Sequence, residues 1–391
     1  MLLALAAEDS RLDLRDELLA TPGAEASELL PGLFETALDV GNGELLPHLA
    51  FARQALPAAS QREAASVKSW AGLLADATAG VLPDHQPWAL HVFPFSTHTS
   101  ASRMGAREWH TRSRSGSPKA LAEPRPAASV GQPRCDLIVE ATRALLGKRR
   151  RHLLHALRRA PKPFGEHESL VQLMLTSPQA GYLSVAPAPL PFSARQLIAC
   201  FPGGLVSPPL DREAPSRAYL KLLEAEARLG RAISARETCV DLGASPGGWT
   251  YVAAQRGARV TAVDRSELRE DLMRHRAVRF QRGDAFRYEP DAPVDWLICD
   301  VIAAAERSVE LLLRWLERGL CRRFIVTIKL AEGDARGALA RLKRELPQLA
   351  GPYFLLKLCH NKKEISAFGI AKPAGTAAIL GPGAEFGDAP K

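Results

Sequence analysis

The sequence has no apolar run that approaches the roughly 20 residues a helix needs to span a bilayer. Its start, MLLALAAEDS, turns acidic early and lacks the basic residues that open a secretory signal. No cysteines form a CxxC pair, no zinc-ligand spacing is present, and the ten histidines form no HExxH motif. We therefore expect a globular, cytoplasmic protein with free buried thiols, no membrane segment and no metal.

The glycine-rich stretch at 243–248, GASPGG, lacks both common nucleotide-binding patterns. It is not the dinucleotide fingerprint GxGxxG, and it has no Lys-Ser/Thr pair of the kind that ends a phosphate-binding P-loop. These absences disfavour a dehydrogenase and a nucleoside triphosphatase. They favour a ligand that is a nucleoside without phosphates.

The surrounding segment 238–250, TCVDLGASPGGWT, has the order strand, acidic residue, glycine turn, helix. Glycines at such a turn let the backbone approach a ligand closely, and the helix that follows begins beside it. The residues predicted to contact the ligand here are Asp241, Gly243, Ser245, Pro246, Gly247, Gly248 and Trp249.

Two more aspartates end the next apolar runs. RVTAVD ends at Asp264, where a carboxylate can accept ribose hydroxyls, and QRGDAF places Asp284 within reach of an adenine amino group. Any one of these aspartates alone is more often a helix cap or a loop residue. Three in order favour a nucleoside site, and S-adenosylmethionine is the ligand that fits best.

The segment 214–370 resembles the FtsJ-type ribose 2'-O-methyltransferases. It is most similar to the RlmM-like subgroup, which methylates a cytidine of large-subunit ribosomal RNA. The resemblance rests on the motifs APSRAYLKLLE, DLGASPGGWT, WLICDV, FIVTIKL and HNKKEISAF, in this order.

The resemblance implies a catalytic tetrad of Lys221, Asp300, Lys329 and Glu364, with Asp300 also beside the cofactor. Local pattern agrees with this placement, because Asp300 ends the apolar run WLIC and Lys329 interrupts FIVTI-K-L. The carboxyl ends of neighbouring parallel strands meet at the ligand site of a doubly wound sheet. Singly, Lys221 is typical of a solvated helix surface, Asp300 of a helix cap, and Glu364 of a surface charge pair.

Lys329 is the strongest single indication of chemistry, because an ammonium buried without a partner is costly. We expect it to be the general base that takes the proton of a ribose hydroxyl. A second ammonium, Lys221, is expected to lower the pKa of Lys329, while Asp300 and Glu364 orient the amines and limit that shift.

Two positions depart from the family pattern. Ala218 stands where the resemblance leads us to expect a hydroxyl that contacts the cofactor, and VIAAAE follows Asp300 without the usual turn containing Met or Pro. These departures affect the expected cofactor affinity and the substrate loop, and they leave the reacting groups in place.

Charge is distributed unevenly around a net charge of +8. Residues 1–46 hold ten acids against Arg11 and Arg15, whereas residues 101–162 hold fifteen Lys or Arg against four acids. The basic block includes GKRRRHLLHALRR, predicted to be a helix with its leucines inward and its basic side chains outward. A solvated helix is the ordinary interpretation; beside a nucleoside-directed domain, contact with RNA is favoured.

We predict an α/β protein in which a doubly wound, mostly parallel sheet carries the methyltransferase site. An α+β region with the layout of a THUMP-type RNA-binding module is expected to precede it, with strands near 88–95, 170–176 and 181–185 and helices near 136–146 and 150–160. The predicted parts are an acidic segment 1–45, the THUMP-like region 46–186 with a basic insertion at 96–134, a linker 187–214, the methyltransferase domain 215–371 and a disordered tail 372–391. The acidic segment could be a helical lid or a partner-binding segment.

Three functions remain open at this level. The favoured one is methylation of a cytidine ribose in large-subunit ribosomal RNA, the second is 2'-O-methylation of transfer RNA, and the third is a catalytically idle RNA-binding or assembly protein that retains the cofactor site.

Overall fold

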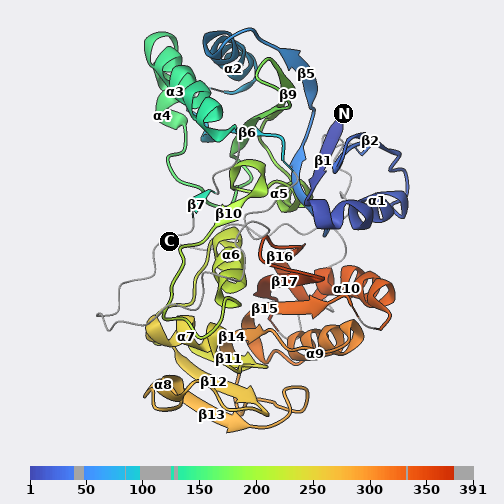
Figure 1. The fold of residues 1–391 in the computed structure, drawn as a ribbon, viewed down its shortest axis with the longest axis vertical. Helices are drawn as coiled ribbons and strands as arrows, with labels where there is room; N and C mark the ends of the chain where they lie inside the picture. The colour runs from blue at the N-terminus through green and yellow to red at the C-terminus, as the bar shows by residue number, and fades with distance from the viewer. Residues whose placement is uncertain (39–47, 84, 97–124, 127–130, 332, 374–391) are drawn as a thin grey trace. The chain divides into compact units, whose positions relative to one another are not determined.

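A computed structural model describes residues 1–38, 48–83, 85–96, 125–126, 131–331 and 333–373 (Figure 1). The chain divides into two compact units. The first comprises Met1–Glu213, Leu220–Ala232 and Leu355–Asn361, and the second comprises Ala214–Tyr219, Ile233–Phe354 and Lys362–Lys391. The basic insertion 97–124 and the tail from 374 lie outside the described residues.

The first sheet of the first unit has the order β2-β3-β1-β4, and each neighbouring pair of its strands is antiparallel. Its strands are β1 (Leu2–Ala6), β2 (Ala26–Leu30), β3 (Leu33–Thr36) and β4 (Ala52–Leu56), and α1 (Arg11–Leu19) follows β1. Glu17 on α1 is buried and accepts hydrogen bonds from the backbone N–H groups of Ala50 and Phe51, at 2.9 and 3.1 Å. The described part of the acidic segment 1–45 is therefore built into a sheet and is not a helical lid.

The second sheet has the order β5-β9-β8-β6, in which β6 and β8 are parallel. Its strands are β5 (Ser60–Glu63), β6 (Trp88–Pro94), β8 (Ser169–Leu175) and β9 (Ala180–Ala186), and its helices are α2 (Val67–Val81), α3 (Gln132–Arg149) and α4 (Arg151–Ala156). Leucines and tryptophans of the helices and strands share one core, which includes Trp70, Trp88, Leu146 and Leu153. The α+β layout expected here is present; its relation to THUMP modules stays a prediction.

The predicted helix 150–160 is shorter than expected and ends at Ala156. Leu157 is extended and bridges to Trp88, and the N–H of Arg158 donates to the Trp88 carbonyl at 2.8 Å. The Arg158 guanidinium turns inward, 3.4 Å from Glu168 and over the ring of Phe164. Arg158 therefore does not belong to the exposed basic face on which the sequence placed it.

The predicted linker 187–214 contains α5 (Phe192–Leu197), a short 3-10 turn (Pro202–Gly204) and β10 (Val206–Ser207), which pairs with β7 (Arg125–Pro126). Leu190, Phe201 and Val206 are buried in one core cluster with Phe164 and Leu170. This segment is thus packed into the first unit, although the sequence predicted a connection between domains.

The second unit is built on a seven-stranded sheet of order β13-β12-β11-β14-β15-β17-β16 (Figure 1). Its strands are β11 (Thr238–Leu242), β12 (Arg259–Asp264), β13 (Val278–Arg282), β14 (Val294–Cys299), β15 (Cys321–Lys329), β16 (Ala350–Leu356) and β17 (Glu364–Ala371). The first five strands are parallel, and β17 runs antiparallel to β15. The order reverses between β11 and β14, which is where ligands bind in open α/β sheets.

The helices that accompany this sheet are α7 (Gly248–Gln255), α8 (Glu270–Met273), α9 (Ala305–Glu317) and α10 (Ala335–Leu349), and α6 (Tyr219–Leu229) precedes β11. In the central strands, Trp296–Cys299 of β14 and Phe324–Val326 of β15 are buried and apolar, as expected for a sheet covered on both faces. The predicted doubly wound, mostly parallel fold is confirmed. Across both units, no helix of the described residues is long and apolar enough to cross a membrane.

Candidate active site

Lys329, Asp300 and Glu364 meet at one edge of the second unit's sheet. Lys329 is the last residue of β15, and Asp300 directly follows the neighbouring strand β14. The Lys329 Nζ donates to Asp300 Oδ1 at 2.9 Å and also to Glu364 Oε2. Glu364 reaches it because β17 is antiparallel to β15, in a register that places Glu364 directly opposite Lys329.

The two carboxylates hold the pKa of Lys329 above its usual value. Burial lowers this pKa, but the charges of Asp300 and Glu364 and their hydrogen bonds outweigh the burial. The expectation of a lowered pKa was therefore wrong in direction. Three of the four predicted tetrad members form a salt-bridged cluster in which the resting lysine is an ammonium ion.

Lys221, the fourth predicted member, lies on α6 in the segment Leu220–Ala232, which groups with the first unit. It is 6% exposed, so it is not the solvated surface lysine that its place on a helix suggested. Its approach to the other three residues stays a prediction.

The glycine-rich turn has no space for side chains. Gly243 has a φ of +74° and Gly247 a φ of +110°, which L side chains rarely adopt. A Cβ at Gly247 would lie 2.3 Å from Leu272 Cδ1, and one at Gly248 would lie 2.4 Å from Ser216 Oγ. Ser216 is a neighbour of this turn that the sequence did not single out.

Asp241 is buried beneath this turn at 1% exposure. Thr250, in the first turns of α7, donates its hydroxyl to Asp241 Oδ2 at 2.6 Å. Burial raises the pKa of Asp241 to about 7, although hydrogen bonds from Thr250 oppose the shift. The carboxyl thus ties the strand to the helix, a role that the sequence did not assign to it; direct contact with a cofactor stays a prediction.

Asp264 ends β12 and accepts two backbone hydrogen bonds, from Ser245 N–H at 3.0 Å and from Ser266 N–H at 2.8 Å. These bonds fall on different carboxylate oxygens, and each oxygen accepts two hydrogen bonds. Among the described residues, Asp264 therefore retains an acceptor position on each oxygen, which suits a pair of ribose hydroxyls.

Asp284 lies just beyond β13 and accepts from the Phe286 N–H at 3.0 Å and from Arg265 at 2.9 Å. The N–H of Phe286 and the charge of Arg265 hold the pKa of Asp284 below its usual value. Asp241, Asp264 and Asp284 thus lie at or just beyond the carboxyl ends of three adjacent parallel strands, as their order in the sequence predicted.

The remaining loop residues fix the turn. The indole N–H of Trp249 donates to the carbonyl of Ala218 at 2.7 Å, and the carbonyl of Pro246 accepts from the Arg269 N–H at 3.0 Å. The Ser245 hydroxyl donates to the Glu267 carbonyl at 2.9 Å. Ala218 therefore contributes a backbone contact to the turn where the family pattern led us to expect a hydroxyl.

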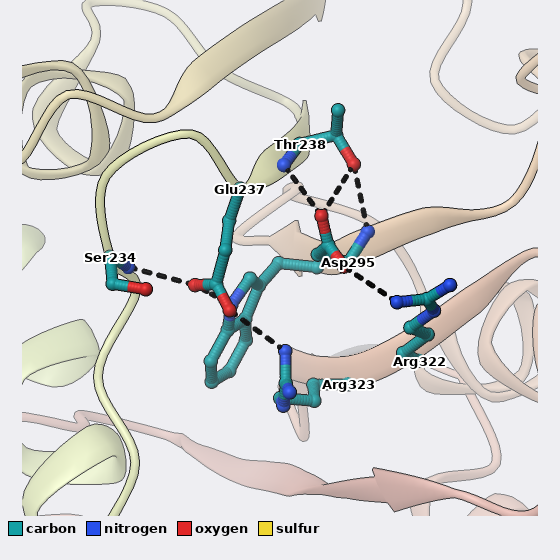
Figure 2. Close-up of polar contacts among 7 residues, drawn as sticks. Ser234, Glu237, Thr238, Asp295, Arg322 and Arg323 are labelled. Carbon is teal, nitrogen blue, oxygen red and sulfur yellow. Dashed lines mark hydrogen bonds and ion pairs between the residues drawn. The ribbon is translucent and has the colours of Figure 1, made fainter.

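Polar side chains also join β11, β14 and β15 at their amino ends, away from the site (Figure 2). The Glu237 carboxylate, next to β11, accepts from the Ser234 N–H at 2.8 Å and from the Trp296 indole of β14 at 2.9 Å. It also pairs with Arg323 of β15 at 3.1 Å. One carboxylate thus connects three neighbouring strands.

A second carboxylate at these strand ends, Asp295, has its own set of contacts and pairs β14 with β11. Its Oδ2 accepts from the Thr238 N–H at 2.9 Å and the Thr238 hydroxyl at 3.0 Å, and its Oδ1 lies 3.3 Å from Arg322 (Figure 2). The carboxyl ends of β11, β14 and β15 carry Asp241, Asp300 and Lys329. These bonds hold the three strands in register and so help to set the relative positions of the three side chains. No pattern in the sequence indicated these contacts.

Among the described residues, no group of three or more His, Cys, Asp or Glu side chains could hold a metal ion. All six cysteines are buried, and none of them forms a disulfide.

Comparison with known proteins agrees with this geometry. Residues 214–341 match the family described as FtsJ-like methyltransferase. This segment is an FtsJ-like methyltransferase domain. The FtsJ-like domain contains the glycine turn, the strand-end aspartates and Lys329, while Glu364 lies beyond the matched residues.

Two relatives bear the name Ribosomal RNA large subunit methyltransferase M. The protein from Pseudomonas syringae pv. syringae (strain B728a) is 43% identical over 150 residues, which cover 37% of this chain and 42% of the relative. The protein from Azoarcus sp. (strain BH72) is 35% identical over 182 residues, 44% of this chain and 50% of the relative. The chain thus spans about half the length of these curated relatives.

A solved structure similar to the chain is the Methanococcus jannaschii fibrillarin pre-rRNA processing protein. It is 17% identical, covers 39% of this chain and 74% of its own, and has a TM-score of 0.31. A TM-score this low does not establish a shared fold. The fold of the FtsJ-like domain rests on its own strand order and on the family match.

Proposed function

We propose that the protein is an S-adenosylmethionine-dependent RNA ribose 2'-O-methyltransferase of the cytoplasm, whose target is a cytidine of large-subunit ribosomal RNA. The observation that carries the proposal is Lys329, held between Asp300 and Glu364 at the strand ends beside the glycine turn. The names of the relatives support the choice of ribosomal RNA.

The residues present suit the proposed cofactor. Gly243 and Gly247 bring the backbone close to the ligand position, where no Cβ fits. Asp264 offers acceptors for ribose hydroxyls, and Asp284 offers one for an adenine amino group. S-adenosylmethionine supplies an electrophilic methyl group on a sulfonium centre, and the carboxylates of Asp241, Asp264 and Asp300 favour a cation nearby.

In this proposal Lys329 would receive the proton of the ribose 2'-hydroxyl as its oxygen bonds to the methyl carbon, whose bond to the sulfonium sulfur would break and leave a neutral thioether. Lys329 must first be neutral, and its raised pKa makes that state rare in the free protein. A cation bound nearby, and the contact with Lys221 that the family resemblance implies, would each lower the pKa of Lys329. Asp300 and Glu364 hold the amine in a fixed direction. General base catalysis contributes roughly 10²- to 10⁴-fold, and orientation of the hydroxyl contributes more.

RNA capture is assigned to the basic residues at the junction of α3 and α4. Lys148, Arg149, Arg150 and Arg151 are all exposed there. Side chains of this kind bind phosphates without reading sequence, so binding should weaken as salt rises. A triple change of Arg149, Arg150 and Arg151 to Gln should lower the salt slope of RNA binding by about two to three. Arg15→Gln, an exposed arginine change elsewhere in the first unit, should leave the slope unchanged.

Incubation with methyl-labelled S-adenosylmethionine and either ribosomal or transfer RNA tests the proposal. Label in large-subunit ribosomal RNA supports it, whereas label in transfer RNA alone indicates the transfer RNA enzyme. An idle binding protein would label neither RNA. In cells that lack the gene, Lys329→Ala would then complement fully, whereas loss of the basic residues would not.

A further inference from the structure

The loop that leads from Asp300 to α9, residues 301–304, has the sequence VIAA and carries no polar side chain. It lies between two charged residues, Asp300 and Glu306. Ile302 in this loop is 87% exposed, whereas the other exposed large hydrophobic residues of the described chain range from 37% to 63%. An isoleucine in water contributes little to stability, because its stabilising effect comes from burial. The fold therefore gives no reason for an isoleucine here.

The loop is fixed at both ends, so Ile302 is held in place beside the site. At its start, the Asp300 N–H donates to the Leu242 carbonyl at 3.3 Å, and the Asp300 carboxylate accepts from Lys329 at 2.9 Å. Val301 packs closely on the glycine turn, since a Cβ on Gly243 would lie 2.8 Å from Val301 Cα.

At the other end of the loop, the Ala304 carbonyl accepts from the N–H groups of Arg307 and Ser308, at 3.2 and 3.4 Å. The Glu306 carboxylate accepts from the N–H of Asp334, in the segment that follows Lys329. The first turn of α9 is thus joined by a hydrogen bond to the segment that follows β15. Ile302 is thus an exposed apolar side chain on a loop whose two ends are held by hydrogen bonds and packing.

We propose that Ile302 is a substrate-positioning residue, whose side chain packs against the face of the target nucleobase. Ile302 is two residues from Asp300, so their Cα atoms lie at most about 7 Å apart. Under the proposed function the ribose hydroxyl must reach Lys329, which pairs with Asp300. The base attached to that ribose then lies close enough to Asp300 for contact with Ile302. This inference rests on the proposed function, and it adds the group that holds the base.

An apolar contact suits this position on chemical grounds. Unpaired RNA bases are commonly bound by packing their flat faces on protein side chains, which tolerates different bases. The neighbouring groups, Asp300, Lys329 and Glu364, are all charged and pair with one another. Within the described residues 300–306, Ile302 is the one large exposed apolar side chain that could cover the base face.

The test is the methylation kinetics of Ile302→Ala on an RNA fragment that contains the mapped target. Removal of side-chain carbons that cover the base should raise the KM for RNA by about 5- to 30-fold. The kcat, the Kd for S-adenosylmethionine and the melting temperature should not change, because Ile302 is 87% exposed. Ile302→Leu should restore the wild-type KM. Leu12→Ala, at a residue 60% exposed on α1, is the matched control and should have no effect.

An RNA fragment that lacks the base at the target nucleotide identifies the contact. With this fragment, wild type and Ile302→Ala should have equal KM values, since there is no base to cover. An unchanged KM for Ile302→Ala on intact RNA, a lower melting temperature, or a difference that persists on the abasic RNA would each overturn the inference. A wild-type protein that methylates no RNA would instead refute the proposed function.

Discussion

Replacing Asp300 with Asn should move the pH dependence of methyl transfer in a defined direction. Asp300 Oδ1 lies 2.9 Å from Lys329 Nζ, and the negative charge of Asp300 helps to raise the pKa of Lys329. An opposite charge at such a distance shifts a pKa by about one to three units. Because Glu364 remains in Asp300→Asn, the pKa of Lys329 should fall by about one unit.

The consequence can be read from kcat/KM for RNA at saturating cofactor. If Lys329 accepts the proton, kcat/KM rises with pH up to the pKa of this lysine in the cofactor-bound protein before RNA binds. In Asp300→Asn the midpoint of this rise should move to lower pH by about one unit. The plateau should also fall, by about 10- to 100-fold, because a hydrogen bond to a charged group is worth about 1.5–3 kcal/mol and its loss leaves the amine less well oriented.

Asp291→Asn, a change at an exposed aspartate of the same unit, provides the control and should leave the midpoint in place. A plateau that falls in Asp300→Asn without any shift of the midpoint would refute the assignment of Lys329 as the base. It would leave Asp300 with a role in holding the cofactor or the loop.

Three further results are expected. Gly247→Ala should weaken cofactor binding at least tenfold by calorimetry, since the new Cβ would lie 2.3 Å from Leu272 Cδ1 at a φ of +110°; Gly80→Ala, which has open space, should not. The pKa of Asp241 is near 4 in the unfolded chain and about 7 in the folded protein, so the free energy of unfolding should fall by up to about 4 kcal/mol as pH rises from 4 to 7. Denaturant unfolding at pH 5 and 8 should show this fall in wild type and not in Asp241→Asn. Glu237→Ala should lower the free energy of unfolding by about 1–3 kcal/mol, because it leaves the indole N–H of the buried Trp296 unpaired, and a stability equal to wild type would contradict the role given to the Glu237 contacts in Figure 2.

The sequence predicted the strand-end residues because each of them follows an apolar run. Asp264, Asp300 and Lys329 all lie at the carboxyl ends of parallel strands, and in a doubly wound sheet those ends converge. The match to the FtsJ-like family confirmed the family prediction for this part of the chain. Local pattern showed only that Glu364 precedes the apolar run ISAFGI; its place opposite Lys329 depends on the antiparallel register of β17, which no local pattern contains.

Other features depended on tertiary contacts that a pattern does not reveal. The direction of the Lys329 pKa shift depended on the balance of burial against two carboxylates. The apolar run LLALA is short, and helices and buried strands of that length look alike in sequence. It forms β1 because β3 and β4 pair with it on either side. Arg158 was misplaced because α4 ends one turn early, where Leu157 bridges to Trp88.

The position of the transferred methyl group tests the account most directly. RNA methylated by the protein with labelled S-adenosylmethionine should be digested to nucleosides, and the labelled nucleoside identified by chromatography and mass spectrometry. The account predicts labelled 2'-O-methylcytidine with wild type and none with Lys329→Ala, which should still bind the cofactor. A label on a nucleobase, or full activity in Lys329→Ala, would contradict it.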